Sequence, residues 1–358
     1  MRSRSVTLSM ALLIALAVTA VPAAAQHRIT TFDIPGSGTS PTQGTFAQAI
    51  NQDGMIAGYY IDGSYHTHGF LRYGRDNIHT IDAGNGTSAF GMNQLRTVTG
   101  SFTDSVSASH GFVYFARNGS LFTFDAPGAG TDSLQGTFPM SVNLMDTITG
   151  PYRDSNDVYH GFVRFATDTY ATFDAPGAGT GSRQGTLPQS INRAGTVAGY
   201  YVDSSNVAHS FLRAASGTIT TFDAPGAGGG SQQGTFANAI NQMGTISGFT
   251  VDSNNVLHGF VRTTDGAVAI FDVSDAGTGA DQGTHPSAIN QGGDITGFYV
   301  DAVGVSHGFV RQSTGSIATF NAPSTGNLTM FPTSINTAGQ VTGYYADANG
   351  VSHGFIRQ

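Results

Sequence analysis

The sequence contains no cysteine, tryptophan, lysine or glutamate. Without cysteine, neither a disulfide nor a lipid-modified cysteine can form, so an oxidising compartment would leave no covalent mark on the chain. Without lysine and glutamate, strong helix formers are scarce, and all 23 acidic residues are aspartates, which favour turns. Glycine, by contrast, reaches 49 of 358 residues. Together these features favour an all-β chain whose charges gather in turns.

Negative charge predominates over positive charge. The formal net charge is -8, and it becomes -10 if Arg2 and Arg4 are removed with an N-terminal leader. Such a balance disfavours a phosphate-rich partner, because the summed field repels it. The sequence therefore predicts neither a nucleic-acid partner nor an anionic membrane surface.

The first 25 residues differ in character from the rest. Arg2 and Arg4 precede an apolar run over residues 10–21, which ends in three alanines before Gln26. This pattern is typical of a cleavable secretory signal and predicts export to a periplasm or to the medium. After its removal, no apolar stretch is long enough to span a membrane. Residues 26–358 are predicted to form one domain.

A stretch of about 49 residues returns seven times. Each copy carries an Ile-Asn pair, a Gly-Tyr-Tyr-x-Asp run, a His-Gly-Phe run and a Thr-Phe-Asp-Ala-Pro-Gly run. The Phe-Asp signature falls at Phe32-Asp33, Ile81-Asp82, Phe124-Asp125, Phe173-Asp174, Phe222-Asp223, Phe271-Asp272 and Phe320-Asn321. The spacing is 49 residues except for one interval of 43. A repeat of this length indicates a solenoid or a propeller.

Each repeat divides into four short segments of strand character. In the fourth copy they cover residues 186–192, 197–203, 209–213 and 219–223. Four antiparallel strands in each of seven repeats predict a seven-bladed β-propeller. Neither end resembles the cap that a solenoid needs. Instead, residues 29–33 form a lone fourth strand, which is predicted to pair with the C-terminal strands within 330–357 and close the ring.

The proline positions predict which strand is innermost. Pro139, Pro188, Pro286 and Pro332 share one place in the first segment of their repeats. A proline cannot donate to a neighbouring strand, so it belongs on an edge. The first segment is therefore predicted to face the central channel, with the other three following outward in order.

Every copy places an aspartate six residues before the histidine of the His-Gly-Phe run. The pairs are Asp62 and His68, Asp104 and His110, Asp154 and His160, Asp203 and His209, Asp252 and His258, Asp301 and His307, and Asp347 and His353. A carboxylate that orients an imidazole occurs in catalytic and metal sites. Equivalent positions in neighbouring blades, however, should lie about 15 Å apart, too far to share one ion. We interpret the pairs as structural tethers and predict no metal site.

Calcium is the one cofactor that the loops suggest. Residues 154–157 read Asp-Ser-Asn-Asp and are rich in oxygen atoms. They lack the full ligand series with a terminal glutamate, and such clusters are ordinary turn chemistry. The prediction is therefore no cofactor, with calcium as the alternative.

A repeated glutamine is the predicted ligand-binding residue. The connection from each fourth strand to the next repeat ends in Gln-Gly-Thr, and it should emerge on the same face as the loop between the second and third strands. These glutamines, predicted to ring the channel mouth, are Gln43, Gln135, Gln184, Gln233 and Gln282. Long polar loops on a rigid scaffold commonly carry binding sites.

An enzyme would need residues that break the repeat symmetry. The candidates are His285, which replaces a Phe or Leu on the sixth inner strand, and Arg96, Asp146 and Arg183. No nucleophile elbow, zinc-protease motif or phosphate-binding glycine loop is present. No catalytic residue is predicted; the alternative is a hydrolase or lyase with its site near His285.

The combination of these runs resembles the bacterial extracellular repeats of the HAF family, named for a His-Ala-Phe run. Here that run reads His-Gly-Phe six times and His-Ser-Phe once, at His209. The resemblance covers essentially the whole chain after residue 25. It implies an exported protein with propeller-like repeats and brings no catalytic residues. The sequence thus predicts an exported, non-enzymatic binding module whose partner is a polysaccharide or an extracytoplasmic protein.

Overall fold

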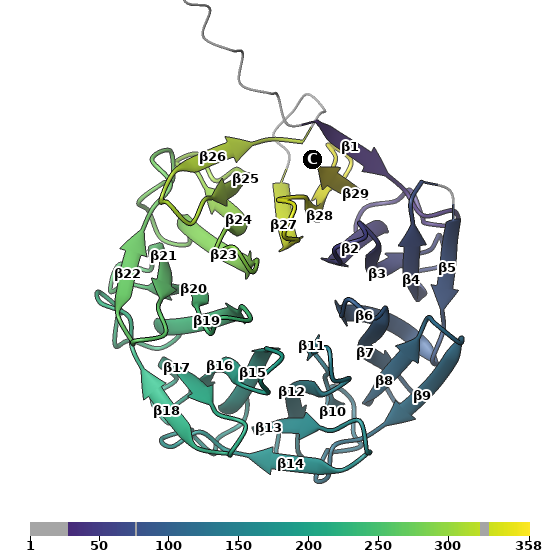
Figure 1. The fold of residues 1–358 in the computed structure, drawn as a ribbon, viewed down its shortest axis with the longest axis horizontal. Coiled ribbons are helices and arrows are strands. Elements are labelled where there is room, and N and C mark those ends of the chain that lie inside the picture. Colours follow the sequence, from purple (N-terminus) through teal and green to yellow (C-terminus); the bar gives the residue numbers. More distant parts are fainter. Residues whose placement is uncertain (1–27, 76, 323–328) are drawn as a thin grey trace, which may run out of the picture.

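A computed structural model describes residues 28–75, 77–322 and 329–358, so the predicted signal over residues 1–25 lies outside the described residues. Within these ranges all regular structure is β, and none of it is helical. The strands are arranged radially around a central opening, as in a β-propeller (Figure 1). A helix long and apolar enough to cross a membrane is absent from the described ranges. The prediction of an all-β chain is confirmed.

Each repeat supplies four antiparallel strands that follow one another outward (Figure 1). Each group is called a blade and takes the name of its innermost strand. The innermost strands are β2 (Gly44–Ile50), β6 (Asn85–Met92), β10 (Gly136–Thr137) with β11 (Ser141–Val142), β15 (Gly185–Ile191), β19 (Gly234–Ile240), β23 (Gly283–Ile289) and β27 (Thr329–Ile335). The second strands are β3 (Ile56–Ile61), β7 (Thr97–Thr103), β12 (Ile148–Arg153), β16 (Val197–Val202), β20 (Ile246–Val251), β24 (Ile295–Val300) and β28 (Val341–Ala346). The third strands are β4 (Thr67–Tyr73), β8 (Ser109–Phe115), β13 (Tyr159–Arg164), β17 (Ala208–Arg213), β21 (Leu257–Arg262), β25 (Ser306–Arg311) and β29 (Ser352–Arg357). The outer strands are β5 (Asn77–Ile81), β9 (Ser120–Phe124), β14 (Tyr170–Phe173), β18 (Ile219–Phe222), β22 (Val268–Phe271), β26 (Ile317–Phe320) and β1 (Ile29–Phe32).

The two ends of the chain meet in one blade. Strand β1 pairs antiparallel with β29, with Ile29 opposite Arg357 and Phe32 opposite Gly354. The N-terminal strand thus becomes the outer strand of the β27 blade, the place that the sequence predicted for it. This pairing covers an edge of β29 that would otherwise expose unpaired N–H and C=O groups.

Aromatic and arginine side chains hold neighbouring blades together. Phe211 of β17 is fully buried and meets Phe173 of the preceding blade edge-on, with ring centroids 5.9 Å apart. The guanidinium of Arg213 lies over the same Phe173 ring at 4.8 Å. The fully buried phenylalanines are Phe70, Phe112, Phe162, Phe211, Phe260, Phe309 and Phe355. The His-Gly-Phe and Phe-Asp runs therefore recur because apolar burial and cation–π contacts join each blade to the last.

The asparagine of the Ile-Asn pair forms a second set of links near the channel. Asn143 accepts hydrogen bonds at Oδ1 from the N–H groups of Met145 and Thr147, which closes its own turn. Its Nδ2 donates to the carbonyl of Asn192 in the next blade, 3.0 Å away. The asparagines that donate in this way are Asn93, Asn143, Asn192, Asn241, Asn290 and Asn336. The donation from Asn336 reaches Asn51, so the last repeat bonds to the first.

The short repeat keeps a complete blade. The β6 blade has all four strands, but β5 ends at Ile81 and β6 begins at Asn85. In the next repeat, β9 ends at Phe124 and β10 begins only at Gly136. The missing residues therefore belong to the connecting loop, and the loop that carries the repeated glutamine is absent before β6.

Candidate functional site

Each predicted histidine lies between two carboxylates or, in one blade, between a carboxylate and an amide. In the β10 blade, Nε2 of His160 is 3.5 Å from Asp154, its predicted partner. The nearer partner of His160 is Asp174, which lies 2.9 Å from Nδ1 and follows the outer strand. The partners of Nδ1 around the ring are Asp82, Asp125, Asp174, Asp223, Asp272, Asn321 and Asp33. Sequence reasoning missed this second partner, although the repeated Phe-Asp signature was its signal.

The pKa shifts in these clusters are those expected of hydrogen-bonded pairs of carboxylate and imidazole. The backbone N–H of Val305 and the imidazole of His307 lower the pKa of Asp301, although partial burial acts in the opposite direction. Burial acts to lower the pKa of His110, but Asp125 and Asp104 outweigh it and raise that pKa. Each imidazole thus joins the third strand to the outer strand and to the loop between the second and third strands.

The oxygen atoms of the loops are used by the loops themselves. Oδ1 of Asp154 accepts hydrogen bonds of 2.9 Å from the N–H groups of both Asn156 and Val158. Within the described ranges, no cluster of three or more metal-ligating side chains is found. The calcium alternative has no preformed ligand set among these residues, and the question stays a prediction.

The repeated glutamines form hydrogen bonds within their own loops, and their predicted role in ligand binding stays a prediction. Oε1 of Gln184 accepts from the N–H of Gly181 at 2.9 Å, and its Nε2 donates to Asn206 at 3.0 Å. Four of the five side chains are buried, and the fifth is half-buried; the set is Gln43, Gln135, Gln184, Gln233 and Gln282. In all five, Oε1 accepts a hydrogen bond from a backbone N–H of the same loop. The Nε2 groups that donate to the neighbouring loop are those of Gln135, Gln184 and Gln233. The sequence alone could not show these bonds, because the side chain of a glutamine in a loop can form hydrogen bonds with water equally well.

Six of the innermost strands carry a β-bulge at one repeated place, and in the β10 blade Met140 holds the equivalent place between β10 and β11. The pairing of β15 with β16 shifts between Pro188 and Ser190, so Gln189 has no residue opposite it. A bulge redirects its extra side chain, and here that side chain lines the central channel. The equivalent residues, which we call the channel ring, are Gln48, Phe90, Met140, Gln189, Asn238, Ser287 and Thr333.

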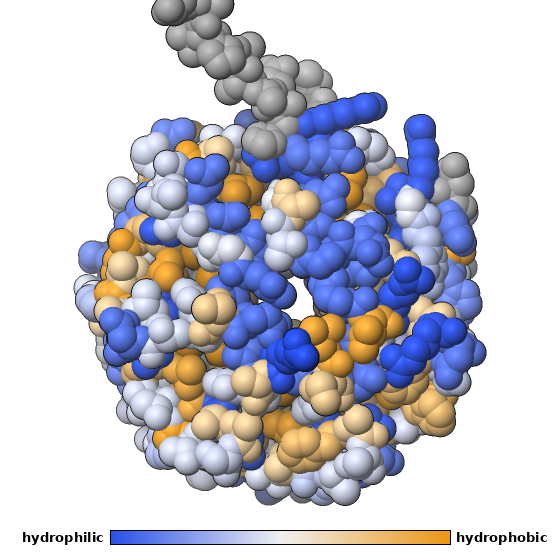
Figure 2. Space-filling model, in the orientation of Figure 1, coloured by the Kyte–Doolittle hydropathy of each residue, from blue (hydrophilic) through white to orange (hydrophobic). Residues whose placement is uncertain are grey.

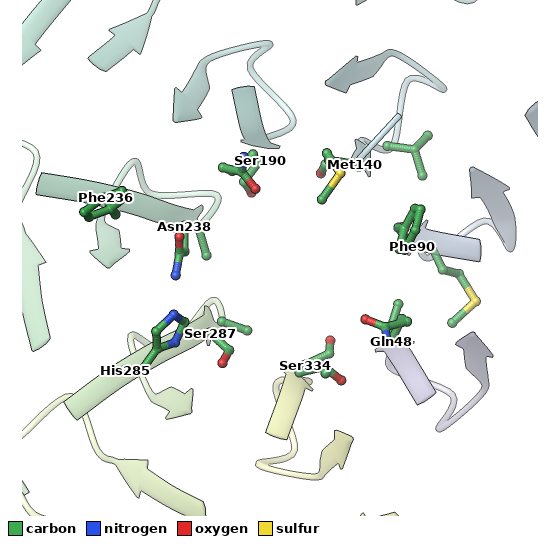
Figure 3. A pocket seen from close by; sticks show the side chains of 18 of the residues that line it. Gln48, Phe90, Met140, Ser190, Phe236, Asn238, His285, Ser287 and Ser334 are labelled. Carbon is green, nitrogen blue, oxygen red and sulfur yellow. The ribbon is translucent and has the colours of Figure 1, made fainter. Parts of the chain in front are cut away.

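The repeats differ from one another at the channel ring. It surrounds a cavity of about 580 Å³ (Figure 3). Phe90 and Met140 make one side of the cavity apolar, and Figure 2 shows hydrophobic atoms on one side of the opening and hydrophilic atoms elsewhere around it. The side chains of Gln48, Gln189 and Ser287 make no hydrogen bond to any described residue. Their polar groups are free for a ligand.

A band of aromatic rings runs from blade to blade, and the members that line the channel cavity are Phe90, Tyr200, Phe236, Phe249 and His285. Phe236 stacks on Phe249 with centroids 4.8 Å apart, and Tyr200 meets Phe236 at 5.0 Å. The band runs through Tyr200, Phe236, Phe249, His285, Phe298, Phe331, Tyr344, Phe46, Tyr59 and Phe90, all partly exposed. Burial raises the pKa of Tyr59 and of Tyr200 to about 12, so both hydroxyls are neutral at pH 7.

His285 is one ring of this band. Its imidazole lies between Phe249 and Phe298, with centroids 4.2 and 4.5 Å away. Nδ1 is shielded and has no hydrogen-bond partner among the described residues. Burial lowers the pKa of His285 to about 4, so the imidazole is neutral at pH 7. No carboxylate belongs to the cavity lining, so His285 lacks the paired acid that a hydrolase would use.

The other residues that break the symmetry lie outside the channel cavity. Arg96 pairs with Asp53 at 3.4 Å, and Asp146 pairs with Arg117 at 3.2 Å. Both pairs belong to turns at the end of the channel away from the glutamine loops. Arg183 lies on the glutamine-loop face, and its side chain is exposed.

A second cavity opens beside the channel on that face. It measures about 460 Å³ and lies between the β15 and β19 blades. Its lining includes Arg183, Asn206 and Gln232 from the loops, together with Tyr200 and Phe236 from the aromatic band. Since Tyr200 and Phe236 also line the channel cavity, the two cavities share a wall.

Comparisons with known proteins yield structural neighbours only. No family model matches the chain, and no curated protein matches it. A prolyl endopeptidase structure has a TM-score of 0.53 at 11% identity, over 91% of this chain and 50% of the endopeptidase chain. The AofleA protein of Arthrobotrys oligospora has a TM-score of 0.46 at 14% identity, over 83% of this chain and 91% of that chain. The Aleuria aurantia lectin, described as a six-bladed β-propeller, has a TM-score of 0.42 at 12% identity, over 78% and 97% of the two chains. The likeness to the endopeptidase concerns the fold and carries no activity with it.

Proposed function

We propose that this chain is an exported, seven-bladed β-propeller that binds a polysaccharide in its central channel. The observation that carries the proposal is the channel ring, in which seven equivalent positions, six of them β-bulges, hold six types of side chain around one cavity. Residues that are alike in every repeat maintain the scaffold. Side chains that differ at one fixed place can fit a ligand that lacks the symmetry of the ring.

The number of blades and the closure of the ring are inferred from the links between repeats. Seven copies of the Phe-Asp signature correspond to the seven groups of strands. Asn336 bonds to Asn51, and β1 pairs with β29, so contacts join the last repeat to the first. The N-terminal sequence and the resemblance to HAF repeats support export.

The lining suits a neutral, hydroxyl-rich ligand. A sugar unit has an apolar C–H face and an edge of hydroxyl groups. The partly exposed ring of Phe90 can pack on the apolar face, and Gln48, Gln189 and Ser287 can donate and accept at the edge. No carboxylate or guanidinium lines the cavity, so a charged ligand would find no partner there. These features favour a polysaccharide over an envelope protein as the partner.

Calorimetry with the chain from Gln26 onward tests the proposal. The titrants are neutral oligosaccharides: β-glucan, mannan, cellulose and chitin fragments. Replacement of Phe90 by alanine should weaken the measured affinity about tenfold, because a stacked ring contributes about 1–1.5 kcal/mol. Phe122→Ala on outer strand β9, where the ring is 54% exposed, is the matched control and should change nothing.

Two outcomes would contradict the proposal. If no saccharide of the neutral panel binds, or if Phe90→Ala and Gln189→Ala leave the affinity unchanged, the channel ring is not the site. Release of new reducing ends that disappears in His285→Phe would show a hydrolase or lyase instead of a binding module.

A further inference from the structure

The cavity between the β15 and β19 blades is built from side chains that vary on a constant backbone. The residue before each repeated glutamine has a left-handed conformation, with φ of 65° at Arg183 and 67° at Gln232. The same position holds Thr42, Leu134, Arg183, Gln232 and Asp281. The facing loop has its own left-handed residue, which here is Asn206, with φ of 61°. Two variable positions therefore meet at each of the five junctions that carry the repeated glutamine, as Gln232 and Asn206 do here, independently of the channel ring.

Arg183, in the loop that enters β15, adds an uncompensated positive charge to the lining of this cavity. The guanidinium of Arg183 forms no ion pair with any described residue, and its side chain is exposed. The nearby carboxylate of Asp157 is already paired with Arg153 at 3.3 Å. The backbone N–H of Arg183 donates to the carbonyl of Asp157 at 2.7 Å, which fixes the point from which the side chain extends. An exposed guanidinium without a partner is notable in a chain of net charge -8.

The remaining lining offers hydrogen-bonding groups and an aromatic wall. Asn206 uses Oδ1 to accept from Gln184, which leaves its NH₂ group available. The side chain of Gln232 has no hydrogen bond to a described residue. Tyr200 and Phe236 provide partly exposed rings.

We infer that this cavity binds a carboxylate-bearing sugar unit of the polysaccharide. The Arg183 guanidinium holds the carboxylate through a two-point hydrogen-bonded ion pair, which a neutral sugar cannot form. Asn206 and Gln232 bond the hydroxyl groups, and Tyr200 and Phe236 pack against the sugar ring. Because the two aromatic residues also line the channel, one glycan chain can occupy both cavities. The inference rests on the proposed function for its ligand class and adds the acidic unit.

Calorimetry with three acidic probes tests the inference: oligogalacturonate, oligomannuronate and hyaluronan fragments, each beside its methyl ester. At least one acid should bind about tenfold more tightly than its ester, and Arg183→Gln should remove that difference. Higher salt should weaken the binding of the acid and leave the ester unaffected. The matched control is Arg193→Gln, at the other end of β15, which should retain the preference.

The outcomes separate this inference from the proposed function. Binding of neutral saccharides with no preference for any acid, or a preference that survives in Arg183→Gln, overturns the acidic subsite alone. Binding of an acid that depends on Arg183, with no neutral saccharide bound, overturns the channel ring as the site and supports the acidic subsite. Absence of binding by every neutral and acidic probe overturns both. If Arg193→Gln removes the preference for the acid as fully as Arg183→Gln does, the preference comes from the general positive charge of the chain, and the subsite is also overturned.

Discussion

At the scale of single residues, two kinds of histidine occupy opposite environments. His110 lies between Asp104 and Asp125, both within ion-pair distance, and these carboxylates raise its pKa. His285 lies between Phe249 and Phe298 without a carboxylate, and burial lowers its pKa to about 4. The stability that His110 contributes should therefore fall as pH rises, and the stability that His285 contributes should fall as pH drops.

The pKa of His110 can be measured directly by NMR titration of its imidazole. We expect a value above the ordinary 6.5 or so, and a larger fall in Asp125→Asn than in Asp104→Asn, because Asp125 lies at 3.0 Å and Asp104 at 3.5 Å. The raised pKa implies stability that is full below about pH 6.5 and is lost as pH rises through the folded value. The ring is a quarter exposed, so this contribution stays below about 1 kcal/mol. A pKa that is unchanged in both variants would show that the contacts are not formed in solution.

Replacement of His285 by phenylalanine should stabilise the protein. In the parent protein, a shielded nitrogen without a hydrogen-bond partner costs about 1–3 kcal/mol of stability, and the variant removes this nitrogen. Phenylalanine already occupies the equivalent place in other repeats, at Phe236 and Phe46. Since the folded pKa is depressed, the unfolded chain binds more protons between pH 6.5 and 4, and stability falls as pH drops through that range. Urea unfolding at pH 7 and pH 4.5 measures both effects. The contribution of His285 to the acid loss between these two pH values is on the order of 2 kcal/mol, so the total loss should be smaller by that amount in His285→Phe; an equal loss in both proteins would contradict the assignment.

At the scale of the strand, sequence patterns gave reliable positions but not local distortions. Proline at Pro188 predicted an inner edge strand, and β15 lies innermost (Figure 1). The bulge beside it, at Gln189, could not be predicted, because pairing shifts arise from the match between two strands and from no single residue. Variation at that one place among the repeats was the available signal.

Deletion of residues 29–33 should lower the melting temperature sharply. The variant removes β1, exposes the edge of β29 and breaks the 2.8 Å contact between His353 and Asp33. Differential scanning calorimetry measures the change, and a chain that begins at residue 29 is the control. An unchanged melt would refute closure by the two ends of the chain.

Asn336→Ala should cost about 2–3 kcal/mol in urea unfolding. The amide bonds to Asn51 in the first repeat and also accepts from two N–H groups of its own turn, so its removal leaves buried groups unpaired. Asn349→Ala is the matched control, because that side chain is exposed and bonds only within its loop. Equal effects of the two substitutions would contradict a special role for the asparagine links.

At the scale of the whole molecule, repetition made the fold predictable and hid the site. Hydrophobic runs and glycine turns recur in register along the chain, and the lone strand at residues 29–33 completes the last set, so the order of the strands followed from sequence. Repetition also drew attention to Gln184 and its equivalents, whose amides prove to be buried in loop contacts. Recognition of an asymmetric ligand by a ring of equivalent blades requires side chains that differ between blades. Only the three-dimensional structure shows that these differing side chains line one cavity.

The most direct test of the account is a hydrogen-exchange footprint of the chain from Gln26 onward, with and without the tightest-binding saccharide of the panels. We predict slower exchange in the inner-strand segments that carry Phe90, Gln189 and Asn238, with outer strands β5, β9 and β18 unchanged. Protection confined to the outer strands, or none in the presence of bound saccharide, would contradict a binding site in the central channel.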